Sequence, residues 1–70
     1  ALGTNASADE LALSGMAKYQ LKDFVGAIAD LSKSIDGGTK EKQAYSLRGS
    51  SYFETQDFAK ALPDFNKAIR

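Results

Sequence analysis

Apolar residues recur with a helical period in the second quarter of the chain. Spacings of three and four residues place side chains on one face of an α-helix, because the helix turns about once every 3.6 residues. Asp23 is a good N-cap directly before this run, and Gly37 and Gly38 after it can adopt the left-handed conformation that ends a helix. The pattern therefore predicts a helix from Phe24 to just before Gly37, with these apolar positions: Phe24, Ala27, Ile28, Leu31 and Ile35.

A second helix is predicted before it. Ser7 and Glu10 have the spacing of a capping box, so this helix should begin at Ala8. A short loop at Lys22–Asp23 would join the two helices into a hairpin. The predicted buried face of the first helix consists of Leu11, Leu13, Ala17 and Leu21.

The whole pattern then occurs again. When the sequence is slid along itself, Ala8–Asp36 aligns with Lys42–Arg70, and eight of the 29 aligned pairs are identical. The matches fall on small, apolar and capping positions, where structure constrains a sequence, so the chain is interpreted as two copies of one unit. The identical pairs are Leu13/Leu47, Gly15/Gly49, Asp23/Asp57, Phe24/Phe58, Ala27/Ala61, Asp30/Asp64, Lys33/Lys67 and Ile35/Ile69.

The second unit should therefore repeat the hairpin. Thr39 can cap a helix that runs to about Thr55, and Asp57 can cap the next helix. Pro63 lies inside that last helix, where it cannot donate to the carbonyl of Ala59, so a kink or a widened turn is expected there. Short connections favour antiparallel neighbours.

These residues resemble the tetratricopeptide repeat (TPR) family, whose period of about 34 residues equals the offset from Ala8 to Lys42 and whose pattern is W-x2-L-G-x2-Y, then A-x3-F, then P. The chain departs from it at Ser14 and Arg48 in place of the Leu, at Lys18 in place of the Tyr, and at Thr39 in place of the Pro. The positions that match are Leu11, Gly15, Ala27 and Leu31 in the first unit and Tyr45, Gly49, Tyr52, Ala61 and Phe65 in the second.

The resemblance implies an all-α fold of two tandem helix-turn-helix hairpins, a fragment of a right-handed α-solenoid. Residues 1–7 would be a flexible N-terminal leader, residues 8–41 the first repeat and residues 42–70 a truncated second repeat. The paired glycines and alanines would let the helices approach closely. The gap between the hairpins would be filled by Phe24, Leu31, Phe58 and Phe65.

Composition narrows the function classes. The chain has no Cys and no His, so disulfides and thiol chemistry are excluded and the commonest general base is absent. No activated nucleophile is identifiable, so we expect neither an enzyme nor a cofactor or metal site. Asp30 and Asp64 are expected to be solvated or paired with Lys33 and Lys67 three residues later. No apolar run is long enough to cross a membrane.

The charge pattern argues against nucleic acid as a partner, because nine basic and nine acidic residues are scattered along the chain with no basic stripe. The family resemblance implies instead that the first helix of each unit lines a concave groove for a peptide or protein partner. An alternative for the same residues is that they rest against a neighbouring helix. The expected groove residues are Ala12, Met16, Tyr19, Gln20, Ser46, Ser50, Phe53 and Glu54.

The last helix should leave an apolar edge uncovered at Leu62, Phe65 and Ile69. Two explanations compete: the chain is a piece of a longer repeat protein, or a second copy covers the edge. The leading functional hypothesis is thus a protein–protein interaction module that binds through the groove. The alternative is a structural scaffold that self-assembles through the repeat ends.

Overall fold

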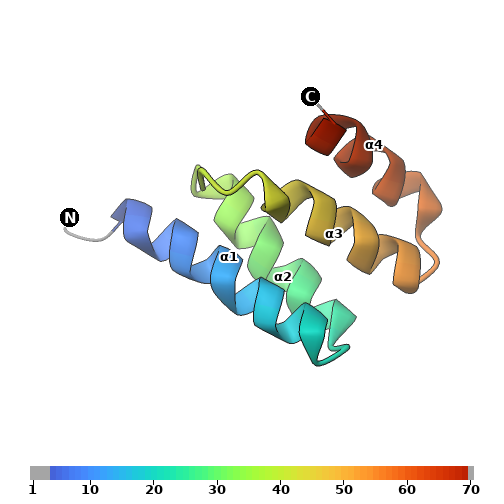
Figure 1. Ribbon diagram of the computed structural model, residues 1–70, viewed down its shortest axis with the longest axis horizontal. Coiled ribbons are helices and arrows are strands. Elements are labelled where there is room, and N and C mark those ends of the chain that lie inside the picture. The colour runs from blue at the N-terminus through green and yellow to red at the C-terminus, as the bar shows by residue number, and fades with distance from the viewer. Residues whose placement is uncertain (1–3, 70) are drawn as a thin grey trace.

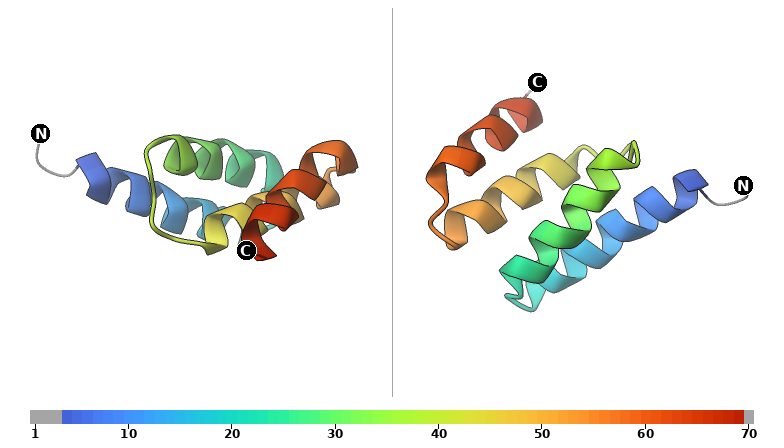
Figure 2. Two further views of the ribbon diagram at one scale, coloured as in Figure 1. Left: turned by 90° about the horizontal axis from the view of Figure 1, so that it is seen from above. Right: turned by 180° about the vertical axis from the view of Figure 1, so that it is seen from behind.

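The computed structural model describes the backbone of residues 4–69 and the side chains of residues 8–69, and within this part of the chain it contains four helices and no strand. Consecutive helices run in opposite directions and pack against each other, α2 on α1 and α4 on α3, while α3 also lies against α2 (Figure 1). The molecule is therefore two helical hairpins side by side, 37 × 27 × 14 Å in extent (Figure 2). The helices are α1 (Thr4–Gln20), α2 (Phe24–Asp36), α3 (Gln43–Glu54) and α4 (Phe58–Ile69).

The predicted bounds of α2 are confirmed. The carboxylate of Asp23 accepts a hydrogen bond from the backbone N–H of Gly26 at 3.0 Å, which satisfies one of the free donors of the first turn. At the other end, the N–H of Gly37 donates to the carbonyl of Lys33 at 2.9 Å. Gly38 follows with φ of 81°, a conformation that glycine adopts without steric cost.

The predicted start and buried face of α1 are wrong. The helix begins at Thr4 rather than at Ala8, so residues 4–7 of the expected leader are helical and Ser7 lies inside the helix instead of capping it. Residues 1–3 lie outside the described residues. The buried positions of α1 are Ala8, Ala12 and Gly15, whereas Leu13, Ala17 and Leu21, which were predicted to be buried, are exposed.

The start of α3 also differs from the prediction. Thr39 does not cap the helix, which begins at Gln43. The hydroxyl of Thr39 instead donates to the carboxylate of Asp9 on α1 at 2.7 Å and accepts from the N–H of Glu41 at 3.2 Å. These bonds hold the linker between the hairpins against α1, and the chain needs three further residues to reach the helix. The end of α3 at Glu54 lies within one residue of the predicted end.

The two loops within the hairpins have the same geometry. Lys22 and Gln56, which occupy the same position in the two units, are the two non-glycine residues with positive φ among those described, at 66° and 68°. In each loop the N–H of the following aspartate donates to a carbonyl five residues earlier, from Asp23 to Lys18 and from Asp57 to Tyr52, both at 2.8 Å. The two turns that the repeat predicted are thus the same in backbone conformation.

The helices of each hairpin approach closely at a glycine. A Cβ atom on Gly15 would lie 2.6 Å from Cγ of Leu31, and a Cβ atom on Gly49 would lie 2.9 Å from the ring of Phe65. Such distances are too short for a methyl group unless the neighbouring side chain shifts, so glycine allows the close approach in both hairpins. The small buried residues Ala27 and Ala61 complete the close contact on α2 and α4.

Pro63 does not end its helix, since α4 continues to Ile69. Ala59 and Pro63 both lie on the exposed side of α4. Water can therefore bind the Ala59 carbonyl that the proline leaves without a helical donor. A kink at this position stays a prediction.

Candidate functional site

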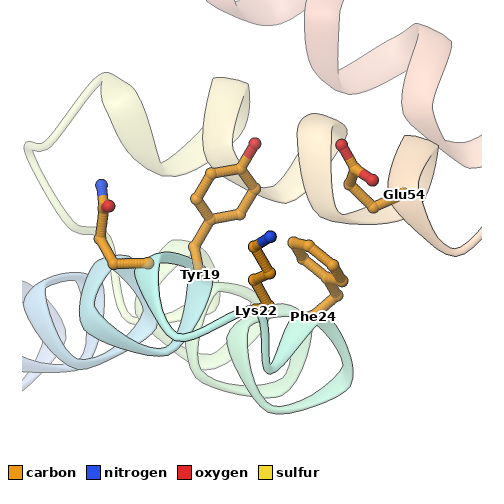
Figure 3. A pocket seen from close by; sticks show the side chains of 5 residues that line it. Tyr19, Lys22, Phe24 and Glu54 are labelled. Atoms are coloured by element: carbon orange, nitrogen blue, oxygen red, sulfur yellow. The ribbon is translucent and has the colours of Figure 1, made fainter.

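A hollow of about 310 Å³ opens between the two hairpins. It lies where α1 ends, α2 begins and the last residue of α3 comes alongside (Figure 3). Because both hairpins contribute to its wall, it exists only when they are packed together. The residues that line it are Tyr19, Gln20, Lys22, Phe24 and Glu54.

Two aromatic rings form one wall of this hollow. Tyr19 at the end of α1 and Phe24 at the start of α2 meet edge to face, with ring centroids 5.5 Å apart and planes at 68°. The tight loop brings them together, since the positive φ of Lys22 reverses the chain within three residues. Aromatic rings in this arrangement provide a rigid apolar surface, and the Tyr19 hydroxyl adds one polar group at its edge.

Opposite charges flank the aromatic wall. The side chain of Lys22 rises beside the rings of Tyr19 and Phe24, and the carboxylate of Glu54 projects from α3 on the far side (Figure 3). Lys22 and Glu54 are both exposed. The hollow therefore offers an apolar surface together with a cationic and an anionic group, a combination that suits a side chain and the polar backbone of a peptide.

Seven of the eight predicted groove residues are at least partly exposed, and they fall into three groups. Tyr19, Gln20 and Glu54 are brought together in the hollow. Met16, Ser46 and Ser50 are half-buried on α1 and α3, and Phe53 is exposed beside a second hollow.

The expected exposure of Ala12 is wrong. This residue, on α1, has no exposed area. Ala12 is therefore unavailable to a partner in this arrangement.

Two residues of the hollow were absent from the predicted groove. Phe24 was expected to fill the seam between the hairpins, and Lys22 was assigned only to a loop. The signal that could have found them is their position, since the residues on both sides of a two-residue turn must lie next to the end of the preceding helix.

The second hollow, of about 290 Å³, lies on the outer side of α4 and the end of α3. Leu62, which lines it, and Ile69, further along α4, are both exposed, as predicted for the apolar edge, whereas Phe65 is half-buried. Phe58, which was expected to be covered between hairpins, is 55 % exposed and meets Phe53 edge to face at 5.1 Å. The hollow is lined by Phe53, Phe58, Ala61, Leu62 and Phe65.

The pairing expected for Asp64 is wrong. Its carboxylate is buried between α3 and α4, where Arg48 donates to it from Nε at 2.7 Å and from Nη2 at 2.8 Å. Lys67 is not a member of this pair. The hydrogen bonds that the Arg48 guanidinium donates to the Asp64 carboxylate raise the pKa of Arg48.

Asp30 has a similar interhelical position in the first hairpin. Its carboxylate accepts from the Ser14 hydroxyl at 2.7 Å and lies 3.0 Å from Nζ of Lys18, not beside Lys33 as expected from the helical spacing. The Ser14 hydrogen bond, followed by that of Lys18, lowers the pKa of the Asp30 carboxyl below its ordinary value of 3.8. Both aspartates thus hold the helices of a hairpin together.

In the part of the chain that the structure describes, no helix is long and apolar enough to cross a membrane. The same residues contain no group of three or more Asp or Glu side chains placed to hold a metal ion.

Comparisons of the chain with protein-family models, with curated proteins and with solved structures gave no match. The resemblance to the TPR family therefore depends on the residues of this chain and on the spacing of its two units.

Proposed function

We propose that this chain is a TPR-type interaction module that binds an extended peptide segment of another protein across the ends of α1 and α3. The observation that carries the proposal is the hollow between the hairpins. It brings together Tyr19, Gln20 and Glu54, three residues that the register of the repeat places on one face of the first helix of each unit. The family assignment draws further support from the matching loops and glycine contacts of the two hairpins.

The chemistry of the hollow favours a particular kind of peptide. The edge-to-face pair of Tyr19 and Phe24 can cover one apolar side chain, since buried aromatic anchors dominate the energetics of small interfaces. Lys22 and Glu54 both line the hollow and can pair with charged neighbours of that side chain. An apolar residue flanked by one acidic and one basic residue therefore matches the hollow.

The test is selection from a displayed library of random peptides, followed by affinity measurement. Peptides selected on the wild-type chain should bind the Tyr19→Ala variant at least about tenfold more weakly, because truncation of an interfacial aromatic anchor has an effect of this size or larger. Val25→Ala is the matched control, since Val25 is 73 % exposed on α2 and does not line the hollow.

Folding is checked in the same experiment. Tyr19 is half-buried against the core cluster of Ala27, Leu31 and Ala44, so Tyr19→Ala should lower the thermal midpoint. Binding is therefore compared at a temperature at which circular dichroism shows both chains fully folded. Selected peptides that bind the folded Tyr19→Ala variant as tightly as they bind the wild type would exclude this hollow as the binding site.

A further inference from the structure

The face of α2 that points toward the second hairpin is covered. Ala27 and Leu31 on this face form a buried cluster with Ala44 of α3, and Leu47 of α3 and Ile35 of α2 pack against it. α3 therefore covers this face of α2 with Ala44 and Leu47, which lie one turn apart. We call α1 and α2 hairpin 1, and α3 and α4 hairpin 2.

The equivalent face of α4 has no such cover. Leu62 is 61 % exposed and lines the second hollow, and Ile69, two turns later on α4, is 83 % exposed. The register of the repeat relates this face to the one that α3 covers on α2, with Ile69 in place of Ile35. We call Phe58, Leu62, Phe65 and Ile69 the tail surface.

In the repeat register, the face of α3 that covers α2 corresponds to the outer face of α1. The same register relates Leu47 to Leu13 and Ser51 to Ala17. Leu13 is 58 % exposed, and Ala17 is exposed one turn later. We call Glu10, Leu13 and Ala17 the head surface. The molecule thus carries an unfilled hollow at one end and an exposed leucine at the other end, in the register that joins its own two hairpins.

We infer that copies of this chain stack head to tail, with Leu13 of one copy in the second hollow of the next, as Leu47 packs on hairpin 1. The rotation and translation that place hairpin 2 beside hairpin 1 would then place hairpin 1 of the added copy beside hairpin 2. Each contact joins two different surfaces, so it leaves a free head and a free tail and lets further copies add. This interaction uses the outer ends of the molecule and goes beyond the proposed peptide site.

The head and tail surfaces carry no charge that would oppose this contact, except for one carboxylate. The tail surface consists of four apolar residues, so it presents no like charge to a second copy. Glu10 is the exception on the head surface, because it corresponds to Ala44, which is almost fully buried. A carboxylate that loses water without gaining a partner weakens an interface. Stacking is therefore reversible, and it rises with protein concentration.

The first experiment measures the average mass of the 70-residue chain by sedimentation equilibrium as its concentration is raised. The wild type should rise progressively above the 7.5 kDa of one copy. Glu10→Ala should associate about tenfold more tightly, because it removes the one charge from the contact. Val25→Asp is the control, since Val25 is exposed outside both surfaces, and it should associate as the wild type does.

The second experiment blocks one surface at a time. Leu13→Asp destroys the head surface and Leu62→Asp the tail surface, so each variant alone should stay monomeric. Both positions are more than half exposed, so both variants should keep the helical circular dichroism of the wild type. An equimolar mixture should form a dimer and nothing larger, because one intact tail remains for one intact head.

Each other outcome overturns the inference. A wild-type chain and a Glu10→Ala variant that both remain monomeric to the limit of solubility would mean that the tail surface has another occupant, such as a different protein or a further segment of a longer chain. Dimers of Leu13→Asp alone, combined with monomers of Leu62→Asp, would show symmetric pairing of two tail surfaces. If either aspartate variant fails to fold, Glu10→Ala, which removes no packing, still decides the question.

Discussion

Leu31 in hairpin 1 and Phe65 in hairpin 2 each pack against the equivalent glycine of the neighbouring helix, yet their surroundings differ. Leu31 has no exposed area, because α1 covers it on one side and α3 on the other. Phe65 contacts Gly49 in the same way but also lines the open second hollow. The comparison shows that burial at a repeat position depends on the neighbouring hairpin as much as on the residue.

The interhelical ion pairs show a second difference between the hairpins. Position 30 and its counterpart 64 are both aspartate, but the cation that meets them comes from a different turn of the preceding helix. In hairpin 1 it is Lys18, with Ser14 donating a hydrogen bond. In hairpin 2 it is Arg48, at the position that corresponds to Ser14. The departures from the repeat pattern at these positions therefore preserve one carboxylate contact with two sets of donors.

The largest effect is expected at the covered core. Leu31→Ala should lower the free energy of unfolding by about 2–4 kcal/mol, the usual cost of an enclosed cavity. Since a domain of this size has only about 3–5 kcal/mol of stability, the variant should be largely unfolded. Urea unfolding followed by circular dichroism at low concentration measures this. Leu62→Ala, the same change on the open face, should cost less than about 0.5 kcal/mol, and equal costs would contradict the comparison.

The next largest effect is expected at the ion pair of hairpin 2. Asp64→Asn should lower the free energy of unfolding by about 2 kcal/mol, because it leaves the half-buried guanidinium of Arg48 without its counter-charge. Asp30→Asn should cost about 1 kcal/mol or less, since its partner Lys18 is 40 % exposed and water screens the pair. The same urea titration compares the two, and a larger loss for Asp30→Asn would reverse this ranking.

Features that depend on local sequence could be predicted. The bounds of α2 and the start of α4 follow from the apolar period and from the aspartates at positions 23 and 57, and both loops follow from the repeat. The start of α1 could not be found in this way, because Ser7 and Glu10 have capping-box spacing and yet lie inside a helix that begins at Thr4. A helix tolerates serine in its interior, so the local signal was misleading.

Features that depend on distant contacts could not be predicted. The start of α3 shifts because the Thr39 hydroxyl bonds to Asp9, which is 30 residues away. The resemblance placed Tyr19, Gln20 and Glu54 on one face, but the hollow that joins them forms only where two hairpins meet. Ala12, which the resemblance placed in the groove, is fully buried instead.

A smaller effect is expected at the two glycine contacts. Gly15→Ala should lower the free energy of unfolding by about 1–2 kcal/mol, because the methyl group would meet Cγ of the enclosed Leu31 at 2.6 Å. Gly49→Ala should be close to neutral. The ring of Phe65 can shift toward the open hollow, and the higher helix propensity of alanine, about 1 kcal/mol, offsets the remaining overlap. Urea midpoints that fall equally would mean that the open side gives Phe65 no freedom.

Removal of the aspartate before α2 and of the aspartate before α4 should change the free energy of unfolding by amounts that differ by about 1 kcal/mol or less. Asp23→Ala should cost about 1 kcal/mol, because the Asp23 carboxylate accepts from the Gly26 N–H. Asp57→Ala should cost less, since the Asp57 carboxylate lies 3.8 Å from Nζ of the exposed Lys60. Thermal midpoints of the two variants test this ordering, and a greater loss for Asp57→Ala would show that its carboxylate caps α4 in solution.

The smallest effect is the pH dependence contributed by Asp30. Hydrogen bonding from Ser14 and Lys18 lowers the pKa of this carboxyl in the folded chain below its ordinary value of 3.8, so the unfolded chain binds the proton more tightly. Its contribution to stability is therefore fully present above pH 3.8 and is lost as the pH falls through the lower, folded pKa. The difference in free energy of unfolding between the wild type and Asp30→Asn should shrink over that acidic range. A difference that stays constant with pH would mean that Asp30 stabilises hairpin 1 by hydrogen bonding alone. The charge of Lys18 would then not stabilise hairpin 1 as the charge of Arg48 stabilises hairpin 2.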